Sequence, residues 1–438
     1  MYTAISLPAR HFGQAEVILC AGHRPMHNRN VKHIAKRYIH SIREDFMHCT
    51  TISNSTKKQF AACYSTFFIN GALALSIGAL LPYIRDSYGL DYAFAGLLVS
   101  LHSVGNLISS FLAGVLPLWL GRRKSMLVFS FCFMLSFMMM TWGATPALLI
   151  AAYLMSGLAR GAVSNFNNSV INEIAPGKAI ALNILHAMFA IGAFLAPFIV
   201  LLCTSGNAEN WRVMCYLMAG MGVVEFIIYA LMPIPHDEVV KAEKASSNGA
   251  FLREKQFWIC TGTLFFYLCA EQGVIGWMVT YFKDSGLMSA GYAQMMASIL
   301  WILILIGRLT AGWLSLHISK SRLLVLMGLG FVLFFGVVML GRSLPLITFG
   351  IAGFGFSMAG IYPTTVSLSG DTIKAYPLAW STMLTLAGFG AILMPSVIGT
   401  VANTAGIYAG MLTITVAVAL TLCFIFANFM LHRGENAD

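Results

Sequence analysis

Charged residues are scarce in this chain of 438 residues, at 10%, whereas hydrophobic residues make up 58%. Ordinary globular domains carry about 25% charged residues, because a chain of this size must cover a large surface in water. The deficit excludes a water-soluble fold. Cysteine is also sparse: there are nine, and no two form a CxxC pair, so neither a disulfide scaffold nor a cysteine metal site is expected. An integral membrane protein remains.

Several functional motifs are absent as well. The sequence has no GxxxxGK[ST] loop for ATP phosphates, no GxSxG or HExxH motif of hydrolytic enzymes, and no basic run interleaved with aromatic residues. We therefore expect neither a nucleotide-driven pump nor a membrane-embedded enzyme. We also expect no nucleic-acid partner, no cofactor and no metal ion.

Long apolar runs are what the chain does have. A bilayer core of ~30 Å is crossed by a helix of about 20 apolar residues. Twelve such runs predict an all-α membrane protein with twelve transmembrane helices. In the first half they are Phe60–Leu81, Tyr92–Leu116, Ser125–Trp142, Leu148–Phe166, Ile180–Cys203 and Trp211–Leu231. In the second half they are Phe257–Phe282, Tyr292–Leu314, Leu323–Leu340, Leu346–Thr364, Leu378–Val401 and Ile407–Leu431.

A polar stretch after the sixth run divides the chain into two six-helix halves, 58–232 and 256–432, joined by a linker at 233–255. Two short motifs recur six helices apart: Gly105-Asn-Leu matches Gly307-Arg-Leu, and Gly192–Pro197 matches Gly390–Pro395. Their similar spacing predicts that the halves are pseudo-repeats. A basic, His-rich tail (1–57) is expected to be disordered or to reflect a misplaced start codon ahead of Met47, and a short tail (433–438) ends the chain.

The distribution of Lys and Arg predicts the orientation in the membrane. Twelve of these residues lie on the side that holds both chain ends, and four lie on the other side. The twelve are Arg122, Arg123, Lys124, Lys178, Lys241, Lys244, Arg253, Lys255, Lys320, Arg322, Lys374 and Arg433, and the four are Arg85, Arg212, Lys283 and Arg342. Positive residues are retained on the cytoplasmic side, so both termini and the linker are predicted to be cytoplasmic, in the plasma or inner membrane.

The connection between the second and third runs resembles the GxLxDRxGRRK loop of the major facilitator superfamily. The matching residues are Gly114, Gly121, Arg122, Arg123 and Lys124. Leu118 stands where the motif has an acid, and Trp119 where it has Arg. The basic cluster is expected to hold carbonyl ends of neighbouring helices during conformational change, but this loop lacks the acid of the charge relay that the resemblance implies.

Other stretches resemble the fucose permease-like branch, the fucose–galactose–hexose proton symporters. They are Ala181–Ala193, Glu271–Tyr281, Gly307–Gly312 and Gly360–Thr364, and the resemblance covers residues from about 58 to 431. It implies proton symport of a sugar or related polyol. The branch has acids in spans one and four, whereas here span one has none and span four reads Ala162-Val163 at that point, so a proton must bind elsewhere.

Span four concentrates polar residues on one face. At 100° per residue, Arg160, Ser164 and Asn167 fall at about 0°, 40° and −20°, with Asn168 at the border. A charge in the bilayer costs about 2.5–3.5 kcal/mol, so Arg160 requires a reason. The face either lines a substrate cavity suited to hydroxyls or a carboxylate, or forms hydrogen bonds with neighbouring helices.

Spans five and seven supply further candidates for substrate binding. Asn183 and His186, one turn apart, either bind substrate or satisfy the backbone broken near Pro197. Gln272 offers a donor and an acceptor within an apolar run. Trp277 and Tyr281, also one turn apart, either stack on the apolar face of a sugar or anchor the helix at the membrane interface.

Glu271 and Arg308 are opposite charges deep in the adjacent spans seven and eight. They either pair in one conformation and separate when Glu271 takes up a proton, or form a static buried ion pair.

These features together predict a secondary active transporter that moves a small polar, sugar-like solute by alternating access, coupled to proton symport. Its expected partners are this solute, a proton and the lipid bilayer, and we expect a monomer. Two alternatives stay open: a drug or metabolite proton antiporter that acts as an exporter, and a transporter-like sensor that binds without translocating.

Overall fold

The computed structural model describes residues 53–176, 179–234, 249–370, 372 and 376–434. Residues 58–438 form one compact unit. The described ranges contain helices and no strands. The predicted His-rich tail, most of the linker and the last residues of the chain fall outside them, so those predictions stay untested.

Twelve helical spans are long and apolar enough to cross a membrane in the described ranges, which confirms the predicted number. The first sextet comprises α3 (Asn54–Tyr88), α4 (Tyr92–Leu120), α5 (Arg122–Trp142), α6 (Pro146–Ile174), α7 (Ala179–Thr204) and α8 (Trp211–Leu231), with a short 3-10 helix at Ala208–Asn210. The second comprises α9 (Lys255–Asp284), α10 (Ala290–Leu314), α11 (Lys320–Leu340), α12 (Leu344–Met358), α13 (Ile361–Leu368), α15 (Pro377–Ala405) and α16 (Ile407–Gly434), with a 3-10 helix at Gly249–Arg253.

Helix ends follow local sequence signals. The Asp91 carboxylate accepts a hydrogen bond from the Phe94 amide (2.7 Å) and caps α4. Ser289 caps α10 in the same way through the Tyr292 amide (3.2 Å). Gly121, with φ +78°, separates α4 from α5 in a conformation that favours glycine. Most helices extend beyond the apolar runs, because polar residues continue a helix once it leaves the hydrocarbon.

The tenth span consists of two helices, α12 and α13, separated at Ala359 and Gly360. Pro363 lies in the first turn of α13, where its missing amide proton costs no helical hydrogen bond. The span predicted as one continuous run is therefore broken near its middle.

The two matched glycine–proline motifs make the same contact in both sextets. A side chain on Gly192 of α7 would collide with the Phe68 carbonyl oxygen of α3, and one on Gly390 of α15 with the Phe265 carbonyl oxygen of α9. In each sextet, glycine therefore lets the fifth helix approach the backbone of the first.

The other matched pair repeats this pattern between the second and fourth helices. A side chain on Gly105 of α4 would collide with the Leu154 carbonyl oxygen of α6, and one on Gly307 of α10 with the Phe356 carbonyl oxygen of α12. The two sextets are pseudo-repeats, as the sequence predicted.

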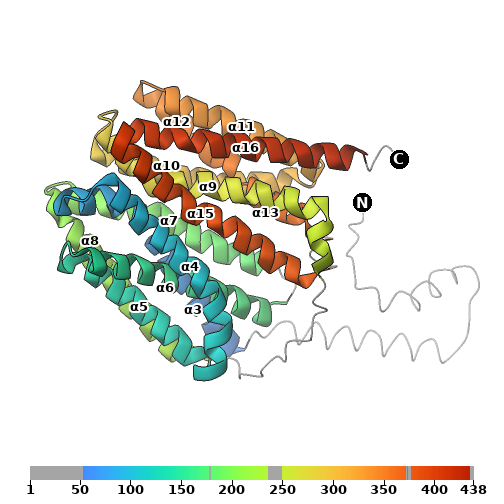
Figure 1. Cartoon of the computed structure of the whole chain (residues 1–438). Helices are drawn as coiled ribbons and strands as arrows, with labels where there is room; N and C mark the ends of the chain where they lie inside the picture. Colours follow the sequence, from blue (N-terminus) through green and yellow to red (C-terminus); the bar gives the residue numbers. More distant parts are fainter. Residues whose placement is uncertain (1–52, 177–178, 235–248, 371, 373–375, 435–438) are drawn as a thin grey trace, which may run out of the picture. The chain divides into compact units, whose positions relative to one another are not determined.

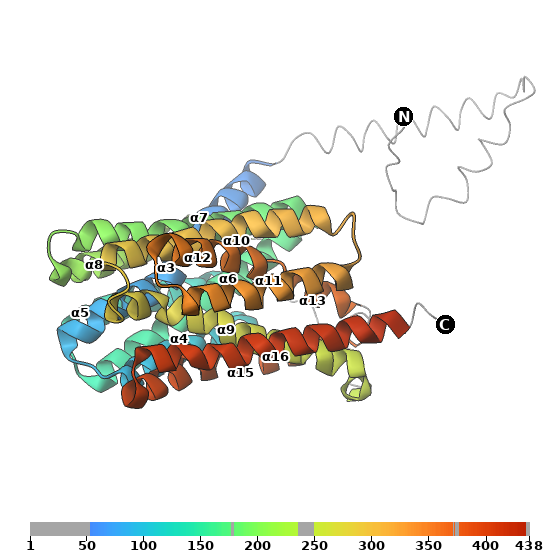
Figure 2. The ribbon, with the colours of Figure 1, turned by 90° about the horizontal axis from the view of Figure 1, so that it is seen from above.

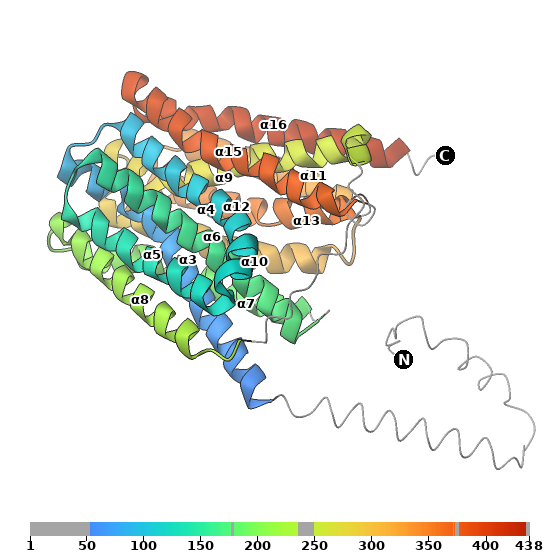
Figure 3. The same cartoon turned by 60° about the horizontal axis from the view of Figure 1, so that its bottom comes forward.

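The sextets meet along several helices, two pairs of which pack over much of their length. Within residues 58–438, α15 packs against α4, and α10 packs against α7. Figure 1 shows α15 beside α4, and Figure 2 shows α7 beside α10. Figure 3 separates the first sextet, drawn in blue to green, from the second, drawn in yellow to red. The interface between them is where a site that responds to both halves can lie.

Candidate functional site

In this conformation a small cavity of about 20 Å³, with room for about one water molecule, lies between the sextets, near the middle of the helices that line it. Its polar lining residues are His102 of α4, Arg160 of α6 and Gln272 of α9, and Trp301 of α10 adds an indole ring. The rest of its lining is apolar. Since both sextets contribute, a molecule held here would contact both halves at once.

Arg160 is the predicted span-four residue that lines this cavity. Its guanidinium is close enough to Glu271 and His102 to interact electrostatically with both. The buried Asn70 of α3 donates from Nδ2 to the Arg160 carbonyl oxygen (3.3 Å) and to Ser164 Oγ (3.2 Å). Nothing in the sequence of span one singled out Asn70, which joins α3 to α6 beside the cavity.

The two asparagines that follow on α6 bond to the protein itself. Asn167 is fully buried; its Nδ2 donates to Thr66 Oγ1 (2.8 Å), and its Oδ1 accepts from the Tyr229 hydroxyl (3.1 Å). Asn168 donates to the Ser164 carbonyl oxygen of its own helix (2.7 Å). In this conformation these two asparagines therefore form hydrogen bonds within the protein, the second of the two alternatives predicted for the polar face of span four.

Glu271 lies at the centre of a polar cluster formed mainly by the second sextet. Its Oε1 accepts a hydrogen bond from the Tyr267 hydroxyl (3.1 Å). The carboxylate interacts electrostatically with Arg308 of α10 and, across the interface, with Arg160. Among described residues it forms no ion pair within 4.0 Å, so the predicted Glu271–Arg308 pair is not closed in this conformation.

Two further predicted residues lie on α7. Asn183 and His186 are exposed, and the His186 ring packs edge-on against Phe67 of α3, with 5.4 Å between ring centroids. His186 also interacts electrostatically with Arg308, across the interface between the sextets. It is therefore directed toward the same central cluster, while its predicted role in binding stays untested.

The predicted aromatic pair packs between helices. Trp277 is fully buried, and its Nε1 donates to the Pro395 carbonyl oxygen of α15 (3.1 Å). Tyr281 is also buried, with its ring against Phe282 and Tyr408. Neither is among the residues that line the cavity, so a stacking role for them stays a prediction.

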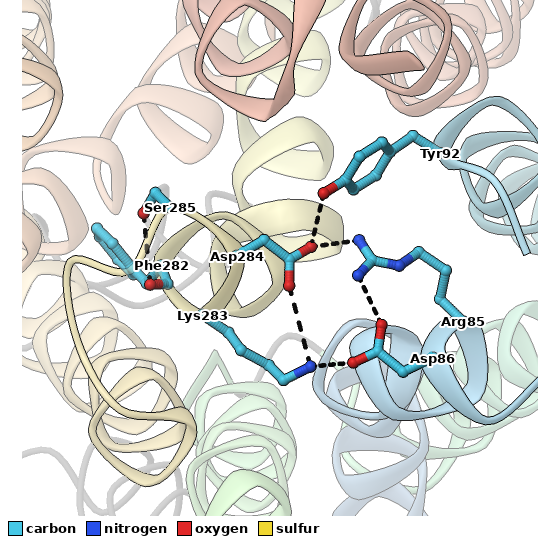
Figure 4. Close-up of polar contacts among 7 residues, drawn as sticks. All are labelled: Arg85, Asp86, Tyr92, Phe282, Lys283, Asp284 and Ser285. Atoms are coloured by element: carbon cyan, nitrogen blue, oxygen red, sulfur yellow. Dashed lines mark hydrogen bonds and ion pairs between the residues drawn. The ribbon is translucent and has the colours of Figure 1, made fainter. Parts of the chain in front are cut away.

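Four charged residues join the two sextets at one end of the interface, which we term the closed end (Figure 4). Arg85 of α3 forms an ion pair with Asp284 of α9, and Asp86 forms one with Lys283. The Tyr92 hydroxyl donates to Asp284 Oδ2 (2.9 Å). The side chains of Arg85 and Asp284 are only 13% and 10% exposed. Sequence reasoning had used Arg85 and Lys283 only as indicators of orientation.

Hydrogen bonds continue from the closed end toward the cavity. Gln294 donates to the Ala79 carbonyl oxygen (2.8 Å), Ser298 to the Phe194 carbonyl oxygen (2.9 Å), and Ser100 to the Ile392 carbonyl oxygen (2.6 Å). Each bond runs from a side chain of one sextet to the backbone of the other.

Gly78 of α3 lies so close to α9 that a side chain there would collide with the Ile275 carbonyl oxygen. The sextets are thus in tight contact over this part of their interface.

The basic loop lies at the opposite end from Asp284 and bonds within the first sextet. Arg122 pairs with Glu173 near the end of α6 (Nη1 to Oε2, 2.8 Å), and Arg123 donates to the Met232 carbonyl oxygen (2.9 Å). The loop lacks its own acid, but α6 supplies one. Arg123 thus holds the carbonyl that follows the end of α8, while the predicted role of the loop in conformational change stays a prediction.

Comparison with known proteins identifies the family. The family model for the Major Facilitator Superfamily matches residues 63–395. The chain belongs to the major facilitator superfamily. Its relatives include protein TsgA of Salmonella typhimurium, 25% identical over 404 residues, covering 88% of this chain and 99% of TsgA.

Solved structures of superfamily transporters share the fold. A variant of the nucleoside transporter NupG matches with a TM-score of 0.70 at 17% identity, covering 85% of this chain and 99% of NupG. A variant of the E. coli fucose–proton symporter FucP matches with a TM-score of 0.59 at 18% identity, covering 86% of this chain and 99% of FucP. These likenesses show the fold, and the family match makes the chain a multi-pass membrane transporter of the superfamily and not an enzyme.

Proposed function

We propose that this superfamily member carries a small polar, sugar-like solute by alternating access, coupled to proton symport. The central cavity supports this most directly, because Arg160 of one sextet and Gln272 of the other line a single space. A solute bound there contacts both halves and is exposed to either side as the halves rock. The fold shared with FucP, a fucose–proton symporter, agrees with this substrate class.

The closed end is proposed to be the outer gate. Arg85 and Lys283 belong to the side that is poor in positive residues, whereas Arg123 and the linker belong to the side that is rich in them. On that assignment both termini are cytoplasmic, and the ion pairs of the closed end seal the cavity from outside. They must separate for the solute to enter.

Glu271 is proposed as the proton-binding group. Among the described residues it is the carboxylate that lies beside the cavity, and it faces Arg160 and Arg308 from opposite sextets. Protonation removes its attraction for both guanidinium groups. This weakens a link between the halves and couples proton uptake to their movement.

Uptake into proteoliposomes containing the full chain tests the proposal. Labelled hexoses, hexuronic acids and nucleosides are offered with and without an inward proton gradient, and we expect saturable uptake of a sugar-like solute that the gradient accelerates. Extrusion of lipophilic cations with no such uptake would favour an exporter. Saturable binding to purified protein with no flux would favour a sensor.

A further inference from the structure

The central cluster carries an excess of positive charge in every protonation state. Arg160 and Arg308 are the guanidinium groups that interact with Glu271, and guanidinium groups stay protonated in proteins. With Glu271 ionised the three residues carry one net positive charge, and with Glu271 protonated they carry two. His102 lies near Arg160 in the same sextet, and His186 faces Arg308 across the interface; each adds either no charge or a further positive one. Tyr267 and Tyr362, which also lie near Arg308, are neutral phenols at physiological pH.

No other carboxylate in the described middle parts of the helices offsets this charge. Glu225 is the other acid there; it is 1% exposed on α8 and accepts a hydrogen bond from Ser130 of α5 (2.9 Å). Its neighbours include Tyr229, and it is not among the charges that act on Arg160. An anion that comes from outside the protein could therefore neutralise the excess positive charge beside the cavity.

The tautomer of His102 defines a second requirement. Its ring is 3% exposed, and Nδ1 lies 2.8 Å from Ser156 Oγ. Ser156 has one hydroxyl proton and donates it to the Tyr153 carbonyl oxygen (2.7 Å), so Nδ1 must be the donor to Ser156. In the neutral ring Nε2 is then an acceptor, and this buried atom has no partner in the structure.

We infer that the cavity binds a hydroxylated organic monoanion, such as a sugar acid, in preference to a neutral sugar. The carboxylate pairs with the surplus guanidinium charge at Arg160, and a hydroxyl donates to His102 Nε2. Gln272 offers both a donor and an acceptor to the remaining hydroxyls. This inference rests on the proposed function, because it names the substrate class of the same site.

Matched solutes test the charge requirement. The thermal stability of the purified full chain and counterflow in proteoliposomes are measured with glucose against glucuronate, and with galactose against galacturonate. We expect the acid of at least one pair to bind about 10- to 100-fold more tightly than its neutral partner, the range for hydrogen bonds to charged groups. Equal or tighter binding of both neutral sugars overturns the inference.

A second pair tests the hydroxyl requirement. Gluconate and hexanoate share a six-carbon chain and a carboxylate, but only gluconate has hydroxyls to donate to His102. We expect gluconate to stabilise the protein and hexanoate to do so about tenfold more weakly, as for the loss of one or two hydrogen bonds. Equal effects of the two acids overturn the hydroxyl part of the inference.

Variants tie the preference to the arginine. Arg160→Gln should abolish the preference for the acid, and Arg160→Lys, which keeps the charge, should retain much of it. Arg342→Gln removes a guanidinium from the exposed connection between α11 and α12 and serves as the matched control. If Arg160→Gln does not fold, Arg308→Gln provides the same test. An acid preference that survives both glutamine variants overturns the assignment.

The outcomes separate this inference from the proposed function. Transport of a neutral hexose without transport of its acid leaves the proposed function standing and removes the inference. If no member of the two hexose pairs and no gluconate is bound or transported, the result counts against both the inference and the proposed function.

Discussion

The closed end and the central cavity use charge in opposite ways. At the closed end Arg85 faces Asp284, and Lys283 faces Asp86, so each charge has a partner across the interface. At the centre, Arg160, which lines the cavity, and Arg308 share the one carboxylate of Glu271. The protein satisfies its own charges at the closed end, which suits a gate, whereas the centre leaves charge for a ligand, which suits a binding site.

The charged groups of the closed end and of the centre also differ in how easily they are hydrated. Removing one partner of a buried ion pair costs about 3–5 kcal/mol, whereas an exposed pair contributes at most about 1 kcal/mol. The closed-end pairs lie at helix ends, where separation of the sextets returns them to water and offsets much of their loss. An unpaired guanidinium in the cavity gains no comparable hydration when this end is closed. If the proposed function holds, the closed end opens and closes at little cost, whereas the central charge is stabilised by a bound ligand.

The largest effect is expected from a change that forces the closed end apart. Gly78→Val places a side chain against the Ile275 carbonyl oxygen and should disfavour the closed state by about 1–3 kcal/mol, or roughly 5- to 150-fold. Transport should fall accordingly. Alkylation of a cysteine introduced at the buried position Ala79 reports the opening.

Gly220 provides the matched control, because no atom lies within 4 Å of a side chain added there. Gly220→Val should leave both alkylation and transport near those of the parent protein. If Gly78→Val left the Ala79 position as protected as in the parent, the close approach of α3 and α9 would not be required for closure.

A smaller but more selective effect is expected in the centre. Glu271→Gln removes the proposed proton-binding group while keeping a similar shape, so uptake should no longer respond to an inward proton gradient. Counterflow, which needs no net proton movement, should continue at a reduced rate. Uptake that remained fully gradient-driven in this variant would exclude Glu271 as the proton carrier.

Loss of one closed-end partner should have a milder effect than Gly78→Val. Asp284→Asn removes the cross-interface partner of Arg85, but Arg85 keeps its contact with Asp86 (2.6 Å). We expect roughly a tenfold increase in alkylation at the Ala79 position, within the range for coupling between sites. Exchanging the charges, with Arg85→Asp and Asp284→Arg together, should restore part of the protection; no restoration would show that the pair does not hold the gate.

The smallest effect is expected at the other buried carboxylate. Glu225→Gln keeps an oxygen that accepts from Ser130, and no arginine or lysine interacts with Glu225 in the described residues. Transport and its proton dependence should be unchanged, and stability should change by less than about 1 kcal/mol. This variant is also the matched control for Glu271→Gln. A loss of proton coupling here would move the proton site to α8.

The fold could be predicted because hydropathy alone counts the spans and two short motifs reveal the duplication. The site could be predicted only in part. The 100° spacing placed Arg160 and Asn167 on one face, yet one lines the cavity and the other bonds to Thr66, because a broad helix face borders both a neighbour and a space. Helical spacing alone does not predict which part of the face contacts a neighbouring helix and which part lines the cavity.

Contacts between residues far apart in the chain could not be predicted from a single sequence. Arg85 and Asp284 lie 199 positions apart, each in the last turn of a helix just after an apolar run, and such polar helix ends have similar compositions. Trp277 was predicted either to stack on a solute or to anchor its helix at the membrane interface, and neither alternative includes the hydrogen bond of its indole to the Pro395 carbonyl oxygen on another helix. Such pairs arise from packing of the two sextets and leave no local pattern.

Three of the side chains that bridge the sextets beyond the closed end donate to main-chain oxygens, at Ala79, Phe194 and Ile392, whereas Ser396 donates to a side-chain oxygen, that of Ser100. A main-chain carbonyl oxygen is present whichever residue occupies the position. Over evolutionary time the receiving positions are thus free to drift in identity, limited only by size, while Gln294, Ser298 and Ser100 bear the whole constraint. Each of these three main-chain bridges then needs one residue to be kept rather than two to change together, so covariation between the sextets should be faint at these positions.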